Sequence, residues 1–95
     1  MIEDISESIG SLYNGKYLGT FGDYGCASLY ANKLITTGEG GFIISNKKID
    51  EKVFFSYACH GFKPNHHFYH DIESGNYKIS GLAAAFGSNE PNNIE

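Results

Sequence analysis

The chain has 95 residues, which is enough for a single domain. Its formal net charge is -4, and all seven of its basic side chains are lysines, so arginine does not occur. Nucleic-acid binding is therefore not expected, because the neutralisation of phosphates requires clustered Lys and Arg side chains.

Two widely spaced cysteines, Cys26 and Cys59, make no disulfide framework, and we interpret them as reduced thiols of a cytoplasmic protein. The N-terminus shows no basic region followed by an apolar run, so a secretion signal is not expected. No window approaches the roughly 20 apolar residues that a membrane-spanning helix needs. The sequence thus predicts a protein that is neither secreted nor inserted into a membrane.

The first predicted element is a short helix over residues 5–13, where apolar side chains recur with helical spacing. Asp4 stands at its N-cap position, and Glu7 follows three residues later, as in a capping box. Asn14-Gly15 is a turn signal that ends this segment.

Two strands are predicted next. Residues 20–25 are punctuated by glycine and lead, as a turn, into a short buried strand over 26–30. A second glycine-rich segment at 38–41 precedes the clearest strand of the chain, residues 42–45.

The second half predicts a helix over 49–59, a loop over 60–74 and a helix over 77–86, with Ser80 as a cap and Gly87 at its end. Alternating strands and helices indicate an α/β layer arrangement. With only two or three strands, such a sheet would keep open edges and uncovered faces.

Lys33 is the first candidate for chemistry, because it follows a short apolar segment and precedes a glycine-rich turn. Partial desolvation there would disfavour the ammonium and free the amine as a nucleophile toward carbonyl groups. The alternative is an ordinary surface lysine, which is the usual state of this residue.

Ser28 and Asp4 are further candidates. A serine hydroxyl beside the backbone N–H groups of glycine turns is typical of an anion site, although most serines in strands are simply packed or capped. A carboxylate at Asp4 would keep a bound pyridine nitrogen protonated. The alternative for Asp4 is the helix N-cap, and the two roles do not exclude each other.

Several motifs follow one another in a fixed order. They are Ile2-Glu3-Asp4 with Glu7-Ser8 and Gly10, Gly19-Thr20-Phe21-Gly22-Asp23-Tyr24-Gly25, Ser28-Leu29-Tyr30-Ala31-Asn32-Lys33, Thr36-Thr37-Gly38-Glu39-Gly40-Gly41, and Gly75-Asn76-Tyr77-Lys78 followed by Ala83-Ala84-Ala85. Together they resemble the DegT/DnrJ/EryC1/StrS family of sugar-nucleotide aminotransferases. The resemblance covers about residues 1–87, and it is closest to perosamine-synthase-like members, which serve polysaccharide biosynthesis.

The resemblance implies an α/β fold, namely part of the large cofactor-binding domain of the aspartate-aminotransferase (fold type I) architecture. Residues 1–87 would form this partial domain, and residues 88–95 would be a disordered or non-family tail. The N-terminal third of the family, which supplies the stacking residue for the cofactor, has no counterpart here, so the domain would be incomplete.

The cofactor that the resemblance implies is pyridoxal 5'-phosphate. Lys33 falls on the lysine that forms the Schiff base and then moves the proton between cofactor and substrate carbons. Asp4 falls on the aspartate that pairs with the pyridine nitrogen, and Glu7 falls where the family has Glu, Gln or His near the ring hydroxyl. Ser28 falls on the phosphate-binding serine. Asn76 falls on an asparagine that reaches the cofactor phosphate in the partner subunit.

The implied reaction is transamination of a keto-sugar nucleotide with glutamate as the amino donor. In the family it takes place in a homodimer whose active sites are shared across the two-fold axis. Lys78 stands where the family commonly has Arg, and lysine lacks the planar fork that would hold the donor's carboxylate. As a lone polypeptide, the chain is expected to hold no stable cofactor and to show little or no activity.

Three alternatives stay open. One is a truncated and inactive remnant with a structural or interaction role. Another is a sugar dehydratase, but that class carries histidine where Lys33 stands. The third is a small metal-binding protein that uses the His60–His70 region, where His66 and His70 are four residues apart. The spacing there matches no closed zinc pattern, so no metal ligand is assigned.

Overall fold

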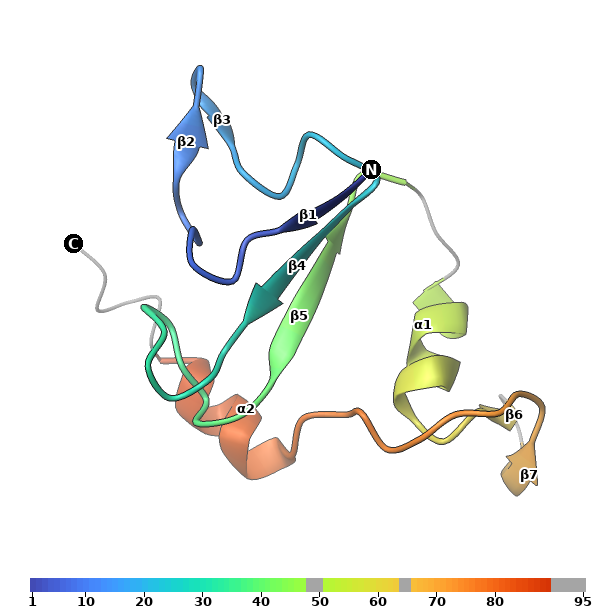
Figure 1. Cartoon of the computed structure of the whole chain (residues 1–95). Helices are drawn as coiled ribbons and strands as arrows, with labels where there is room; N and C mark the ends of the chain where they lie inside the picture. Colours follow the sequence, from blue (N-terminus) through green and yellow to red (C-terminus); the bar gives the residue numbers. More distant parts are fainter. Residues whose placement is uncertain (48–50, 64–65, 90–95) are drawn as a thin grey trace. The chain divides into compact units, whose positions relative to one another are not determined.

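The computed structural model describes residues 1–47, 51–63 and 66–89 of the chain (Figure 1). The chain is divided into two compact units. The first consists of Met1–Lys47 and the segment from Ile79 onward, and the second consists of Lys48–Lys78. Each unit holds its own paired strands and a helix, so the chain has the predicted α/β character.

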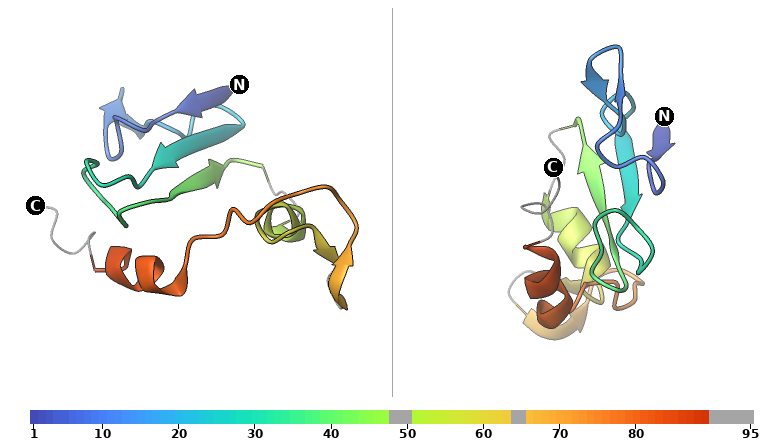
Figure 2. Two further views of the ribbon diagram at one scale, coloured as in Figure 1. Left: turned by 60° about the horizontal axis from the view of Figure 1, so that its bottom comes forward. Right: turned by 90° about the vertical axis from the view of Figure 1, so that its left-hand side faces the viewer.

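The main sheet of the first unit has three strands in the order β1-β4-β5. These are β1 (Ile2–Asp4), β4 (Tyr24–Ser28) and β5 (Gly41–Ser45), and the views in Figures 1 and 2 agree that they lie side by side. Strand β1 runs parallel to β4, whereas β5 is antiparallel to it. Because the carboxyl ends of parallel strands meet at one edge, Asp4 and Ser28 end their strands at the same edge of the sheet.

A small hairpin joins β2 (Leu12–Tyr13) to β3 (Lys16–Tyr17). Its two central residues, Asn14 and Gly15, have φ angles of 50° and 76°. Two positive φ angles in a two-residue loop define a type I′ turn, for which Asn-Gly is the favoured pair. The predicted turn is confirmed.

The predicted helix over residues 5–13 is wrong, because turns and the hairpin strand β2 occupy this segment. Asp4 caps no helix; its Oδ1 accepts a hydrogen bond from the backbone N–H of Ser6 at 3.0 Å. Such a local bond offers the backbone an alternative to the helix. Gly10, with a φ of 82°, turns the chain away from helical geometry.

The strand predicted over residues 26–30 is β4, which begins two residues earlier, at Tyr24, and ends two residues earlier, at Ser28. The turn predicted over residues 20–25 therefore ends sooner, because Gly25 lies inside β4, where a Cβ would stand 2.5 Å from the carbonyl oxygen of Gly19. Glycine is therefore required by a close backbone approach rather than by a turn. The strand predicted over residues 42–45 is confirmed as β5, with Gly41 added.

Helix α2 (Gly81–Gly87) starts four residues later than predicted, because Ser80 is extended. The Ser80 hydroxyl accepts a hydrogen bond from the backbone N–H of Ala83 at 3.2 Å, so the predicted cap is confirmed. The helix ends at Gly87, as expected. The division between residues 1–87 and 88–95 stays a prediction, since residues 90–95 lie outside the described part.

In the second unit, the helix predicted over 49–59 is confirmed as α1 (Glu51–Ala58). Residues 49–50 of the predicted helix lie outside the described part of the chain. Neither this helix nor α2, within the part of the chain that the structure describes, is long and apolar enough to cross a membrane.

The loop predicted over residues 60–74 is partly wrong, since it contains a hairpin of β6 (Phe62–Lys63) and β7 (His66–His70). Its register is irregular near Phe62, which explains why no clean period marks it in the sequence. The rings of Phe62 and His70 pack with their centroids 4.9 Å apart. Aromatic side chains favour strands, and this preference explains why the segment forms a hairpin although apolar and polar residues do not alternate in it.

Few apolar side chains are covered. Among the described residues, Ile5 at 4% exposure and Ala27 at 9% are the buried apolar residues. Large side chains such as Ile43 on β5 and Leu82 on α2 are 54% and 86% exposed. The uncovered faces that the sequence predicts are therefore observed.

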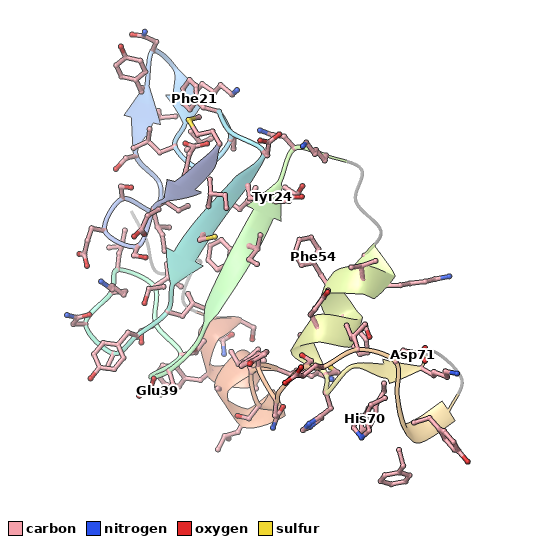
Figure 3. All side chains as sticks on the ribbon, turned by 45° about the vertical axis from the view of Figure 1, so that its right-hand side comes forward. Phe21, Tyr24, Glu39, Phe54, His70 and Asp71 are labelled. Carbon is pink, nitrogen blue, oxygen red and sulfur yellow. The ribbon has the colours of Figure 1, made fainter. Side chains whose placement is uncertain are left out.

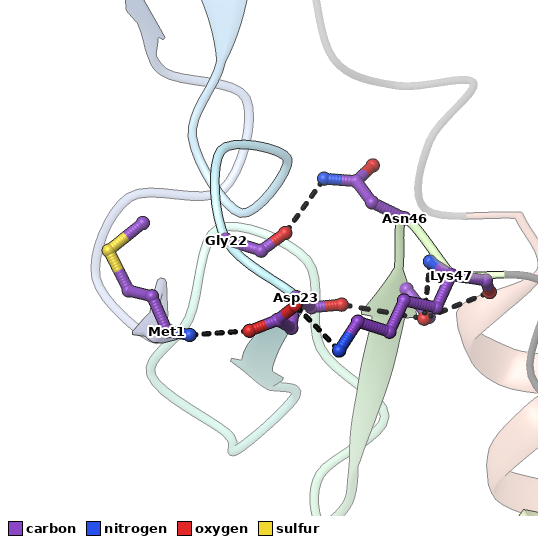
Figure 4. Close-up of polar contacts among 6 residues, drawn as sticks. Met1, Gly22, Asp23, Asn46 and Lys47 are labelled. Atoms are coloured by element: carbon purple, nitrogen blue, oxygen red, sulfur yellow. Dashed lines mark hydrogen bonds and ion pairs between the residues drawn. The ribbon is translucent and has the colours of Figure 1, made fainter.

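A charge cluster ties the ends of β4 and β5 together (Figure 4). The Asp23 carboxylate pairs with the Nζ of Lys47 at 2.8 Å and with the terminal ammonium of Met1 at 2.5 Å. The side-chain amide of Asn46 donates to the carbonyl oxygen of Gly22 at 2.9 Å. Hydrogen bonding and charge from Lys47, and then from Met1, lower the pKa of Asp23 to about 2.

The approach of Gly25 to Gly19 generates a first prediction. Gly25→Ala is expected to lower the free energy of unfolding by about 1–3 kcal/mol, because the new methyl group must displace backbone atoms. Gly81→Ala is the matched control, since a Cβ there meets nothing within 4 Å. Urea unfolding followed by circular dichroism measures both variants, and equal midpoints would contradict the close approach.

The charge cluster generates a second prediction. Because the pKa of Asp23 is depressed from 3.8 to about 2, its pairing stabilises the fold above pH 3.8, and this contribution is lost as the pH falls through about 2. Lys47→Gln should raise the pKa of Asp23 toward 3.8 and move acid unfolding to higher pH. A carboxyl-carbon NMR titration measures the pKa directly, and an unchanged value in the variant would refute the pairing.

Candidate active site

The loop after β4 is closed by its own backbone hydrogen bonds. The N–H of Leu29 donates to the carbonyl oxygen of Gly40 at 2.9 Å, and the N–H of Thr37 donates to that of Leu29 at 3.0 Å. Within the loop, the N–H of Lys33 donates to the carbonyl oxygen of Tyr30 at 3.0 Å, in a tight turn. Lys33 thus stands on a fixed loop at the carboxyl end of a strand.

The ammonium of Lys33 is paired with the carboxylate of Glu7, through its Oε1. The Lys33 side chain is only 13% exposed, whereas that of Glu7 is 84% exposed. Lysine side chains are usually solvated, so the cover over Lys33 is unusual. The structure therefore brings two of the predicted site residues into direct contact, from segments 26 residues apart.

Asp4 is the second carboxylate beside this lysine. Hydrogen bonds from Ser6 lower the pKa of Asp4, and the bond from its side chain has a larger effect than the bond from its backbone. The positive charge of Lys33 lowers this pKa further. The side chain of Asp4 is exposed, and it stays ionised at neutral pH. Asp4, Glu7 and Lys33 therefore form one charged cluster at the edge where β1 and β4 end.

Ser28 is the last residue of β4 and is half-buried. Its Oγ accepts a hydrogen bond from the backbone N–H of Tyr30 at 3.2 Å. The oxygen acts as an acceptor in this bond, so the hydroxyl hydrogen stays available for donation to an anion.

Asn76 belongs to the second unit, where it is exposed and pairs through its backbone with Cys59. Two residues later, the Nζ of Lys78 lies 5.3 Å from the centroid of the Phe55 ring, a cation–π contact. The role of Asn76 at a cofactor phosphate stays a prediction.

Glu3 has a structural role that the sequence did not reveal: it binds the loop that precedes β4. Its carboxylate accepts hydrogen bonds from the backbone N–H groups of Gly19 at 2.8 Å and Gly22 at 2.5 Å. Both bonds lower the pKa of Glu3, and the bond from Gly22 has the larger effect. The sequence shows an acidic residue next to Asp4 and a loop with several glycines. Neither feature indicates that the carboxylate binds this loop.

The metal-binding alternative has no support within the described side chains, where no group of three His, Cys, Asp or Glu residues could hold an ion. The Nδ1 of His70, a residue labelled in Figure 3, lies 2.6 Å from the carbonyl oxygen of His60. The side chains of His66 and His67 lie outside the described set, so this alternative stays untested.

Curated relatives match most of this chain. GDP-perosamine synthase of Escherichia coli O157:H7 is 40% identical over 87 residues, which cover 92% of the chain and 24% of the relative. The UDP-4-amino-4,6-dideoxy-N-acetyl-beta-L-altrosamine transaminase of Campylobacter jejuni is 37% identical over 92 residues, covering 95% and 24%. The chain therefore spans about a quarter of the length of these relatives.

Solved structures also match most of this chain, and the chain again covers about a quarter of their length. A DegT DnrJ EryC1 StrS aminotransferase from Brucella abortus superposes with a TM-score of 0.83 at 26% identity, over 96% of this chain and 24% of that structure. The sequence model of the DegT/DnrJ/EryC1/StrS aminotransferase family matches residues 1–95. This chain belongs to the DegT/DnrJ/EryC1/StrS aminotransferase family.

Proposed function

We propose that this chain supplies the lysine-bearing wall of a pyridoxal 5'-phosphate site in an enzyme that aminates a keto-sugar nucleotide. The observation that carries the proposal is the covered ammonium of Lys33, which is paired with Glu7 and whose charge helps to lower the pKa of Asp4. Membership in the aminotransferase family supports it, as do relatives named for GDP-perosamine synthesis and for a UDP-sugar transamination.

The residues fit the chemical groups of this cofactor. An aldehyde requires an amine, a pyridinium nitrogen requires an anionic acceptor, and a phosphate requires hydrogen-bond donors. Lys33, Asp4 and Ser28 offer these three groups near one edge of the sheet. When bound, pyridoxal phosphate supplies an electron sink for negative charge on the substrate carbon.

Each residue has a distinct task in this proposal. Lys33 would bind the carbonyl carbon of the cofactor and would carry a proton at its Nζ. Asp4 would accept a hydrogen bond from the ring nitrogen, and its lowered pKa keeps it anionic for this purpose. Ser28 would donate its hydroxyl hydrogen to the phosphate. Glu7 would serve the ring hydroxyl, and Asn76 would contact the phosphate bound by a partner subunit in a homodimer.

The substrates in this proposal are a sugar nucleotide and an amino-acid donor, with glutamate as the donor, and the reaction is cytoplasmic. Lys78 would meet the donor's carboxylate as a point charge rather than as a fork. Its contact with the ring of Phe55 already occupies the ammonium, so donor binding is expected to be weaker than with arginine.

The chain alone is not expected to hold the cofactor stably. Asp4 and Glu7 are exposed, so the described residues supply one wall of a site and do not exclude water from it. Electrostatic interactions in such an open site are weakened by solvent. A functional test must therefore restore the surrounding protein.

A chimera provides that test. The matching 87 residues of this chain replace their counterparts in the GDP-perosamine synthase of Escherichia coli O157:H7. Amino transfer to the sugar nucleotide should be retained. Lys33→Ala should reduce it by more than about a thousandfold, the scale of loss when a covalent catalytic group is removed. Turnover and the visible absorbance of the bound cofactor are measured together.

Lys16→Ala is the matched control, because this lysine lies over the ring of Phe21, in the hairpin segment. It should leave both turnover and absorbance unchanged. A correctly folded chimera that binds no cofactor, or that keeps its activity in Lys33→Ala, would defeat the proposal and favour an inactive structural role.

A further inference from the structure

We propose that Glu7 is the residue that controls the reactivity of Lys33: its carboxylate occupies the amine as an ion-pair partner until a carbonyl ligand displaces it. The inference rests on the proposed function of Lys33 as the carbonyl-binding lysine. It assigns to Glu7 a task before ligand binding, separate from any contact with a bound cofactor.

The unequal exposure of the two partners supports this division of tasks. The Lys33 side chain is 13% exposed, so protein atoms surround most of it. The Glu7 side chain is 84% exposed, so water surrounds most of it. A solvated carboxylate can leave the pair at small cost, because water replaces its lost partner. Glu7, rather than Lys33, is therefore the movable member of the pair.

Asp4 is the other carboxylate near Lys33, but it is anchored differently. Its Oδ1 accepts a hydrogen bond from the backbone N–H of Ser6 at 3.0 Å, which fixes it to the turn after β1. Asp4 can thus stay in place when Lys33 changes its partner. Only the carboxylate in direct contact with the ammonium, that of Glu7, must move.

The chemistry of the amine explains why the pair has to break. An ammonium has no lone pair, so Lys33 must release a proton before its Nζ can attack a carbonyl carbon. The new carbon–nitrogen bond then forms, and the carbonyl oxygen leaves as water. The carboxylate of Glu7 contacts this same Nζ atom, so the pair must separate before the atom can reach a carbonyl carbon. Glu7 is in this sense a positioning residue, which acts through Lys33.

The test measures imine formation by the full chain with formaldehyde, a carbonyl probe that needs no cofactor site. Cyanoborohydride reduces each imine to a stable methylamine, and mass spectrometry of peptides gives the rate at each lysine. Glu7→Gln should accelerate methylation of Lys33 about two- to fivefold, the factor expected for loss of one partly exposed ion pair. The rate at Lys16 is the internal reference and should not change.

Two further measurements separate a charge effect from a loss of structure. Glu39→Gln removes the same charge from the loop that leads into β5 (Figure 3) and should leave the rate at Lys33 unchanged. High salt screens ion pairs, so it should raise the rate at Lys33 in the wild type and have little effect in Glu7→Gln. Glu7→Asp keeps the charge and should fall between the two.

A rate at Lys33 that is equal or slower in Glu7→Gln, or no reaction in either protein, would overturn the inference. Failure of the proposed function looks different. In that case, the chimera binds no cofactor, while formaldehyde still reacts faster with Lys33 in Glu7→Gln than in the wild type.

Discussion

Parallel pairing between β1 and β4 is the constraint on which the candidate site depends. The ladder places Asp4 opposite Cys26, and the N–H of Ile5 extends it by donating to the carbonyl oxygen of Cys26 at 2.9 Å. Side chains alternate between the two faces of a strand, so a slip of one residue would turn Asp4 to the opposite face and put Glu3 in its place. The electrostatic setting of Lys33 is therefore determined by backbone hydrogen bonds.

Contacts with the loop before β4 hold that register. Glu3 binds this loop through the N–H groups of Gly19 and Gly22, and Gly25 lets the same loop approach β4. The bonds to Glu3 would be lost if β1 slipped by one residue, because the carboxylate would face away from its donors. Two adjacent acidic residues thus have separate tasks: Glu3 binds the loop, and its neighbour Asp4 interacts electrostatically with Lys33.

Features that depend on neighbouring residues could be predicted from the sequence: the Asn14-Gly15 turn, the strand over 42–45 and the Ser80 cap all lie where expected. The helix over 5–13 was not excluded, because the spacing of its apolar side chains is compatible with a helix and Asp4 suits a helix N-cap as well as the turn in which it binds Ser6. The pairing of Lys33 with a carboxylate 26 residues away was beyond any local pattern.

The exposure of the charged cluster separates what this part of the chain determines from what it does not. The Lys33 side chain is only 13% exposed, so the described residues already enclose most of it. Asp4 and Glu7 remain open to water, and large apolar side chains on the sheet and on α2 are uncovered as well. Desolvation strengthens interactions between charges, so the pairing of Asp4 with a ring nitrogen depends on residues that cover these surfaces. The described residues thus enclose the Lys33 side chain, but they leave the carboxylates of Asp4 and Glu7 open to water.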